Sequence, residues 1–378
     1  MFITDYIVVS VNPDSPITFS FIDSGPPSHS SQNYDTVLMV HGNSFSNAIF
    51  KRLLPLHSKF NIRVVALSRR GYTGSTPFTL GERAILEEEG SVAEDAKAEF
   101  LEMRGVEVLH FIDGFIQRST IPAVQESERG CRGGLTLVGW SLGSVFTFAA
   151  IAHVDSRFVS DDMRTRFGQY IRAYLMLEPA TTNLGLSVPR EAWIPLRDPN
   201  IPAHARGWLF SLLVTGYYDY SDEVLATRDQ DTVLATIAPS TSRIPTIFTF
   251  NKAERDEIVI LTPESSVDLL LTKVLNLQIR QVYHKACYDK QLRSNEALKR
   301  MTIWEIAGDR SYSFIWPAFW EIEKDDIEAG AGVRERFVRF KVLKGVNHFM
   351  HWDEPEKTMS MFRDILDMPD VIPQLYER

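Results

Sequence analysis

Short apolar runs alternate with longer amphipathic stretches along most of the chain. The apolar runs predict strands at 6–11, 17–22, 36–40, 62–67, 135–138, 171–177, 301–306 and 337–343. Apolar positions at helical spacing predict helices at 48–57, after Ser91, from Val145 onward and at 355–366. Strands that alternate with helices predict an α/β fold with a mostly parallel, doubly wound sheet that is covered on both faces.

Ser141 stands where one predicted strand meets a predicted helix. It is the centre of the pattern G-x-S-x-G, with Gly139 and Gly143 two residues away on either side. A sharp strand-to-helix turn strains its central residue, and glycine at the flanking positions lets the two backbones pass. The turn lifts the serine oxygen clear of the fold, beside the free N–H groups of the helix N-terminus. The pattern therefore predicts a nucleophilic serine.

The alternation of strands and helices breaks between residues 179 and 299. This segment is proline-rich and aromatic at its start and lies between two predicted strands. We expect a core made of 1–180 and 299–378, and a cap or lid of residues 181–298 inserted after the sixth strand. It would lie over the carboxyl edge of the sheet, where open α/β folds bind ligands. Aromatic residues of this segment predict a pocket for apolar or ring-bearing small molecules, namely Trp193, Trp208, Tyr217 and Tyr218, together with Phe210 and Tyr220.

Composition narrows the classes of function. The 378 residues carry a formal charge of -9, which argues against a general electrostatic footprint for nucleic acid. Two cysteines, Cys131 and Cys287, cannot make a disulfide framework, and no Cys/His cluster suggests a metal. The first residues lack the basic start and the apolar run of a signal peptide, so we expect none, and no apolar stretch reaches about 20 residues. We expect a cytoplasmic protein that acts on a small molecule, without a cofactor, a metal or a membrane partner; the sequence leaves its oligomeric state open.

Three further stretches accompany G-W-S-L-G in a familiar order. V-L-M-V-H-G-N-S ends the third predicted strand, S-R-R-G-Y-T-G-S follows the fourth, and K-G-V-N-H-F-M-H-W-D-E-P-E follows the last. Together they resemble the α/β-hydrolase superfamily, in the form of a serine hydrolase with a large cap insertion. The resemblance covers the expected core, 1–180 and 299–378, and leaves the insertion unmatched.

The resemblance implies roles for individual residues. The backbone N–H groups of Asn43 and Leu142 would stabilise a developing oxyanion. The base would be His348, because the family pattern of glycine, two residues and histidine selects it over its neighbour His351. Ser68 replaces the aspartate that usually braces the loop after the fourth strand, which we expect to leave the chemistry unchanged.

Two residues are candidates for the acid that orients the base. The family places it three residues after a glycine that follows the seventh strand, but three residues after Gly308 the chain has Ser311. Asp309 is one candidate. The other is Glu178, which directly follows the apolar run of the neighbouring strand, and some superfamily members take their acid from this place. We favour Glu178, because neighbouring parallel strands end at the same edge of a sheet.

These assignments predict a cofactor-free serine hydrolase. It would cleave a carboxylic ester, thioester or lactone of an apolar small molecule through an acyl-enzyme. A serine at the elbow argues against the epoxide hydrolases and haloalkane dehalogenases of the superfamily, which need an aspartate there. Two alternatives stay open: hydrolysis of a carbon–carbon bond in a β-diketone-type substrate by the same residues, and a ligand receptor on the same fold that does not turn over.

Overall fold

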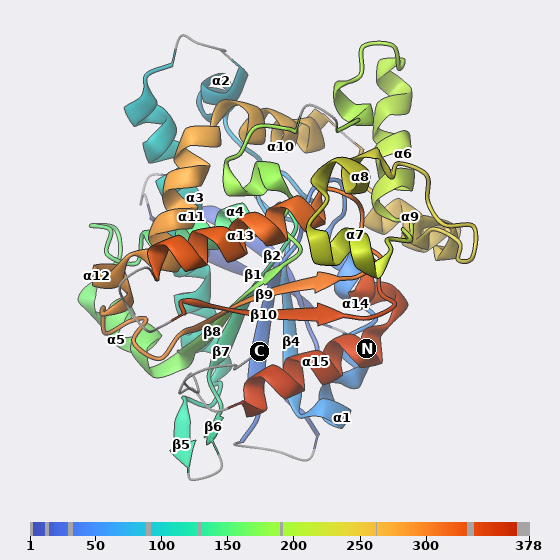
Figure 1. The fold of residues 1–378 in the computed structure, drawn as a ribbon. Coiled ribbons are helices and arrows are strands. Elements are labelled where there is room, and N and C mark those ends of the chain that lie inside the picture. Colours follow the sequence, from blue (N-terminus) through green and yellow to red (C-terminus); the bar gives the residue numbers. More distant parts are fainter. Residues whose placement is uncertain are drawn as a thin grey trace.

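A computed structural model describes residues 3–11, 15–28, 33–87, 92–127, 130–189, 192–261, 263–330 and 336–368. Within these ranges eight strands form one sheet in the order β1-β2-β4-β3-β7-β8-β9-β10 (Figure 1). The strands are β1 (Ile3–Val9), β2 (Ile17–Asp23), β3 (Asp35–Val40), β4 (Ile62–Leu67), β7 (Leu135–Trp140), β8 (Ile171–Leu177), β9 (Thr302–Gly308) and β10 (Val338–Leu343). A separate hairpin joins β5 (Gln125–Ser127) to β6 (Gly130–Arg132).

The sheet is mostly parallel. β2 is antiparallel to both β1 and β4, whereas the pairs from β4 through β10 are parallel. Every side chain of β3, β4, β7 and β8 is buried, as continuous apolar runs predict for the central strands of a parallel sheet. The predicted α/β fold class is confirmed.

Helices cover both faces of the sheet. One face packs against α3 (Glu94–Ser119), α4 (Gly143–Ala152), α11 (Asn276–Tyr288) and α13 (Ile315–Ala329). The other face packs against η1 (Asn47–Phe50), α14 (Met350–Asp353) and α15 (Pro355–Asp367). Two further helices, α2 (Leu80–Glu87) and α5 (Asp161–Tyr170), flank α3. No helix in the described part of the chain is long and apolar enough to cross a bilayer.

Two of the elements predicted from the sequence differ from the structure in detail. The helix expected at 48–57 is instead η1, a second short turn η2 (Leu54–Leu56) and α1 (His57–Phe60). Pro55 lies in this stretch and has no N–H for a continuous helical ladder, which explains the interruption. The first strand begins and ends earlier than the expected 6–11.

The long segment between β8 and β9 is largely helical. Helices α6 to α10 gather beyond one end of the sheet, towards the top of Figure 1, whereas α11 packs along α4 and so shares the layer that covers the sheet. The boundaries 181–298 of the cap remain a prediction. The other elements of this segment are η3 (Thr181–Leu184), η4 (Pro195–Arg197), α6 (Ala203–Val214), α7 (Asp222–Thr227), α8 (Gln230–Ala235), η5 (Thr246–Thr249), α9 (Lys252–Ile258), α10 (Pro263–Val274) and α12 (Lys290–Arg293).

Candidate active site

The sequence-predicted residues gather because parallel strands end at one edge of the sheet. Ser141 directly follows β7, Glu178 directly follows β8, and His348 lies in the loop after β10. The loop that contains Asn43 follows β3, the strand beside β7. The carboxyl edge of an open α/β sheet is where such folds place their ligands.

The turn at Ser141 has the strained backbone that its sequence pattern predicts. The φ angle of Ser141 is 54°, in the left-handed region that few residues other than glycine adopt. The turn is crowded, because a Cβ on Gly143 would lie 2.1 Å from the carbonyl oxygen of Val40. The backbone N–H of Ser141 donates to the Leu177 oxygen at 2.9 Å, which fixes the turn to β8.

The loop after β3 lies against this turn. A Cβ on Gly42 would come within 2.9 Å of the Ser141 Cβ, so only glycine allows this approach. Asn43 and Leu142 both line the same cavity as Ser141. Leu142 precedes the first turn of α4, where backbone N–H groups have no partner within the helix. Among the described residues, neither of these two N–H groups donates a hydrogen bond.

Glu178 and His348 are in direct contact. The Nδ1 of His348 lies 2.6 Å from Oε2 of Glu178, and both side chains are buried. The other carboxyl oxygen, Oε1, accepts a hydrogen bond from the Gly308 N–H at 2.5 Å and another from the Ser311 hydroxyl. A carboxylate at this position favours the tautomer of His348 that carries its proton on Nδ1, which leaves Nε2 unprotonated.

Asp309, the alternative acid, lies elsewhere. Its Oδ1 accepts a hydrogen bond from the Gly345 N–H at 2.5 Å, and its Oδ2 is 3.6 Å from the Lys344 ammonium. The side chain thus braces the turn after β10. Ser311, which occupies the place of the acid in the family pattern, instead donates to Glu178. Counting three residues from Gly308 in the sequence leads to Ser311. The sequence could not show that the Ser311 hydroxyl supports Glu178, an acid that follows another strand.

Two further residues hold the loop of His348. The amide of Asn347 donates to the Thr215 carbonyl at 3.0 Å and to the Thr246 hydroxyl at 2.9 Å. The indole of Trp140 donates to the carbonyl of His348 at 3.0 Å. Both residues are buried. Asn347 precedes His348 in the loop after β10, and Trp140 ends β7 directly before Ser141, but only the fold reveals what each side chain contacts.

A buried ion pair braces the loop after β3. Both oxygens of Asp268, on α10, accept hydrogen bonds from the Arg69 guanidinium, at 3.0 and 2.6 Å, and the Tyr72 hydroxyl donates to Oδ2 at 2.6 Å. Arg69 also donates to the carbonyls of His41 and Gly42 at 2.9 Å. Burial alone would lower the pKa of Arg69, but Asp268 and Tyr72 hold it above its ordinary value. No feature of the sequence linked α10 to this loop.

His41 is a bracing residue. Its Nε2 accepts a hydrogen bond from the Arg69 backbone N–H at 3.0 Å, so the proton on Nδ1 is donated to the Gly42 carbonyl, also at 3.0 Å. Burial and the adjacent Arg69 lower the pKa of His41 well below its ordinary value. Ser68 braces the next loop in the same way, because its hydroxyl donates to the Thr73 carbonyl at 3.0 Å.

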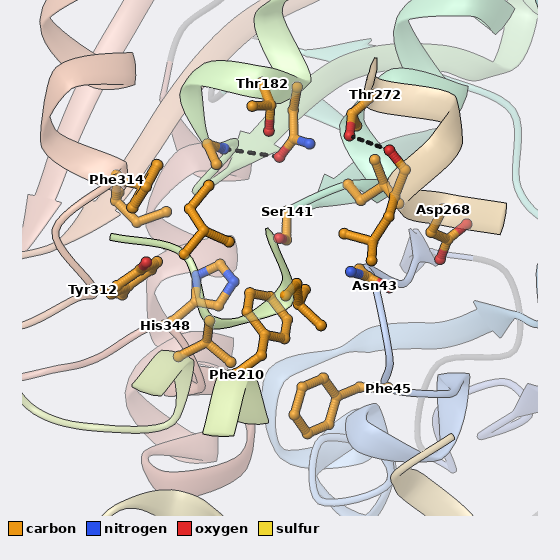
Figure 2. A pocket seen from close by; sticks show the side chains of 18 of the residues that line it. Asn43, Phe45, Ser141, Thr182, Phe210, Asp268, Thr272, Tyr312, Phe314 and His348 are labelled. Atoms are coloured by element: carbon orange, nitrogen blue, oxygen red, sulfur yellow. Dashed lines mark hydrogen bonds between the residues drawn. The ribbon is translucent and has the colours of Figure 1, made fainter. Parts of the chain in front are cut away.

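A cavity opens over Ser141 and His348 (Figure 2). Its wall is mainly apolar, with polar groups from η3, η4 and α10. Its lining comprises Asn43, Phe45, Trp140, Ser141, Leu142, Ala180, Thr182, Asn183, Ile194, Leu196, Arg197, Phe210, Val214, Asp268, Leu269, Thr272, Tyr312, Phe314, Ile315, His348 and Phe349.

Five of the six aromatic residues that were predicted to line a pocket do not line this cavity. The cavity wall takes only Phe210 from that set and leaves out Trp193, Trp208, Tyr217, Tyr218 and Tyr220. The indole of Trp193 donates to Asp198 at 2.8 Å, and Trp208 is exposed to solvent.

Tyr217 and Tyr218 both pack in the interior of the protein. The hydroxyl of Tyr217 donates to Asp353 at 2.6 Å, and that of Tyr218 donates to the Leu213 carbonyl at 2.7 Å. Both rings are fully buried. Aromatic content alone could not separate side chains that pack inside the segment after β8 from side chains that face a ligand.

The comparison with known families decides the classification. The model of the alpha/beta hydrolase family matches residues 37–360. The chain belongs to the alpha/beta hydrolase family. This alpha/beta hydrolase shows no significant match among curated proteins.

Solved structures resemble this alpha/beta hydrolase at low sequence identity. A bromoperoxidase from Bacillus anthracis is 13% identical with a TM-score of 0.49, over 96% of this chain and 100% of that chain. A thermophilic esterase from Thermogutta terrifontis is 14% identical with a TM-score of 0.48, over 96% and 98% of the two chains. Epoxide hydrolase A from Mycobacterium thermoresistibile has the same identity, TM-score and coverage.

Proposed function

We propose that this protein is a cofactor-free serine hydrolase that cleaves a carboxylic ester, thioester or lactone of a largely apolar small molecule. The observation that carries the proposal is that Ser141, at a strained elbow, shares a cavity with His348, whose Nδ1 is held by Glu178 at 2.6 Å. A serine hydroxyl is a weak nucleophile until a positioned base accepts its proton. The apolar cavity wall supports the choice of substrate.

In the first half of the reaction, Nε2 of His348 accepts the proton of the Ser141 hydroxyl while Oγ attacks the substrate carbonyl carbon. The carbonyl oxygen becomes an oxyanion, which the N–H groups of Asn43 and Leu142 stabilise. Glu178 stays ionised and stabilises the imidazolium of His348. The imidazolium then gives its proton to the departing alcohol, thiol or hydroxyl, and an acyl-enzyme remains on Ser141.

The second half of the reaction removes the acyl group. His348 accepts a proton from water, the resulting hydroxide attacks the acyl carbon, and a second oxyanion forms in the same place. The proton returns to Oγ of Ser141 as the carbon–oxygen bond breaks. A carboxylic acid leaves, and the enzyme is restored.

The test is turnover of 4-nitrophenyl esters together with labelling by a fluorophosphonate. We expect Ser141→Ala to abolish labelling and to lower the rate about 10⁴- to 10⁶-fold. The matched control is Ser144→Ala, which removes a neighbouring buried hydroxyl that donates to the Gly139 carbonyl. That variant should still be labelled, with the label on the peptide that contains Ser141. Equal turnover by Ser141→Ala and wild type would overturn the proposal, as would turnover of β-diketones without any turnover of esters.

A further inference from the structure

The cavity wall contains two charged residues besides His348, and they differ in their surroundings. Asp268 is buried, and both of its oxygens accept hydrogen bonds from Arg69. Its charge is therefore balanced inside the protein and is not available to a ligand. Arg197 is the other charged residue of the wall.

Arg197 has no partner of its own among the described residues. It ends η4, and its side chain is exposed although it lines the cavity, so it stands where the cavity opens to solvent. The neighbouring carboxylate of Asp198 is turned away, because it accepts hydrogen bonds from the Trp193 indole at 2.8 Å and from the Asn200 N–H at 2.9 Å. Partial burial lowers the pKa of Arg197, and no carboxylate of the described chain raises it. The guanidinium stays protonated at neutral pH.

A second polar group of the wall is also a donor. Asn183 is buried, and its Oδ1 accepts a hydrogen bond from the Ala180 N–H at 2.8 Å. That bond orients the side chain, so its amide NH₂ is the end left for a ligand. Besides the hydroxyl groups of the wall, which can donate or accept, Arg197 and the Asn183 amide thus offer donors to a ligand, and Arg197 is cationic. Guanidinium and amide donors are complementary to a carboxylate.

We propose that the preferred substrate is an ester that carries a carboxylate, and that Arg197 pairs with this carboxylate at the opening of the cavity. The apolar wall holds the rest of the molecule near Ser141. This inference rests on the proposed hydrolase function of Ser141 and adds a charge preference to it. Arg197 acts on specificity and takes no part in the bond-breaking steps.

The test uses two matched pairs of esters, because the carboxylate can lie on either side of the scissile bond. For the acyl side, 4-nitrophenyl hemiglutarate is compared with 4-nitrophenyl hexanoate. For the alcohol side, 4-butyryloxybenzoate is compared with its methyl ester. We expect kcat/KM of the wild type to favour the anionic member of at least one pair about fivefold to tenfold at low ionic strength. The preference should shrink in 0.5 M NaCl, because the guanidinium is exposed and salt screens it.

Arg197→Met should remove the preference by lowering kcat/KM for the anionic ester, with little change for the neutral one. Arg197→Lys should keep part of it. The control is Arg206→Met, because Arg206 lies outside the cavity wall and donates to the Ile201 carbonyl at 2.9 Å. That variant should behave as the wild type does. A wild type without charge preference in either pair, or a preference that survives in Arg197→Met, overturns the inference.

Binding to the Ser141→Ala background separates this inference from the proposed function. Calorimetry with the same esters should show tighter binding of the anionic member, lost when Arg197→Met is added. Charge-selective binding by a protein that hydrolyses no ester would support the role of Arg197 and overturn the proposed hydrolase function. Efficient ester hydrolysis without charge selection would support the proposed hydrolase function and overturn the role of Arg197.

Discussion

Glu178 and His348 face each other across the end of β9, with 2.6 Å between Oε2 of Glu178 and Nδ1 of His348. The carboxylate is held from its other side by the Gly308 N–H and the Ser311 hydroxyl. These two hydrogen bonds fix the Glu178 carboxylate in the position from which it orients the imidazole of His348. Ser311, at the position where the family usually has its acid, thus supports the Glu178 carboxylate.

We predict that Glu178→Gln lowers kcat about 10²- to 10⁴-fold, because a neutral amide no longer favours the imidazolium or the required tautomer. Asp309→Asn should change kcat less than about threefold, since Asp309 contacts the turn after β10. The measurement is steady-state hydrolysis of one ester, with circular dichroism to verify folding. Loss of activity in Asp309→Asn alone, with that protein folded, would assign the acid to Asp309.

Tyr72→Phe should lower kcat about tenfold with little change in KM. The Tyr72 hydroxyl accepts a hydrogen bond from the Ser44 N–H at 3.0 Å and donates to Asp268, so its loss frees the loop that carries Asn43. Donors that act on an oxyanion contribute in the transition state and not in the bound ground state. Both constants come from the same ester assay.

The control for this prediction is Tyr283→Phe. Tyr283 is also buried and donates to a buried carboxylate, Asp325, at 2.9 Å, but it is not part of the cavity wall. The two variants should lose comparable stability. If Tyr283→Phe lowers kcat as much as Tyr72→Phe does, the effect reports general loosening and the role of the loop is refuted.

His351 should make the protein less stable as the pH falls below about 6.5. The side chain is fully buried beside Trp140 and Phe50, and neither ring nitrogen has a hydrogen-bond partner among the described residues. Burial, and next the nearby His348, lower the pKa of His351 well below its ordinary value. As the pH falls, the unfolded chain binds a proton that the folded chain does not bind, so the free energy of unfolding decreases by up to about 1.4 kcal/mol per pH unit.

His351→Phe should remove this contribution and retain activity. Denaturant unfolding between pH 5 and pH 8 measures it: the variant should show a shallower pH dependence than the wild type. His41, whose pKa is also lowered, should account for part of the remaining slope. An unchanged slope in His351→Phe would contradict the prediction.

Glu305 should have the opposite pH dependence. It lies on β9 with 0% of its side chain exposed, and neither carboxyl oxygen has a partner among the described residues. Burial and the nearby Glu178 raise the pKa of Glu305 well above its ordinary value. Above about pH 4.5 the unfolded chain loses a proton that the folded chain keeps, so the wild type loses stability as the pH rises.

Glu305→Gln should therefore be more stable than the wild type at pH 8, with a difference that closes towards pH 4.5. Chemical denaturation over this range measures the difference. Glu296→Gln, at an exposed glutamate, is the control and should match the wild type throughout. A Glu305→Gln variant that is less stable than the wild type at pH 8 would contradict the prediction.

The sequence by itself determined the central sheet, the elbow and the family. Strands β3, β4, β7 and β8 appear as largely apolar runs because both of their faces are buried, and the charged residues within them, such as Arg63 and Arg172, are paired with carboxylates. The glycines around Ser141 follow from the crowding of one tight turn. Such constraints act within a few residues, so they leave a readable local pattern.

Only the tertiary structure decided the surroundings of these residues. Arg69 and Asp268 are 199 positions apart, and Glu178 and Ser311 are 133 apart, so no local pattern joins them. Whether Glu178 or Asp309 contacts His348 depended on where each side chain points after the strands align. The cavity wall depended on how the segment after β8 folds back, which buried Tyr217 and Tyr218 and left Arg197 at the opening. Contacts of this kind arise from packing between distant segments, and residue type at a single position does not encode them.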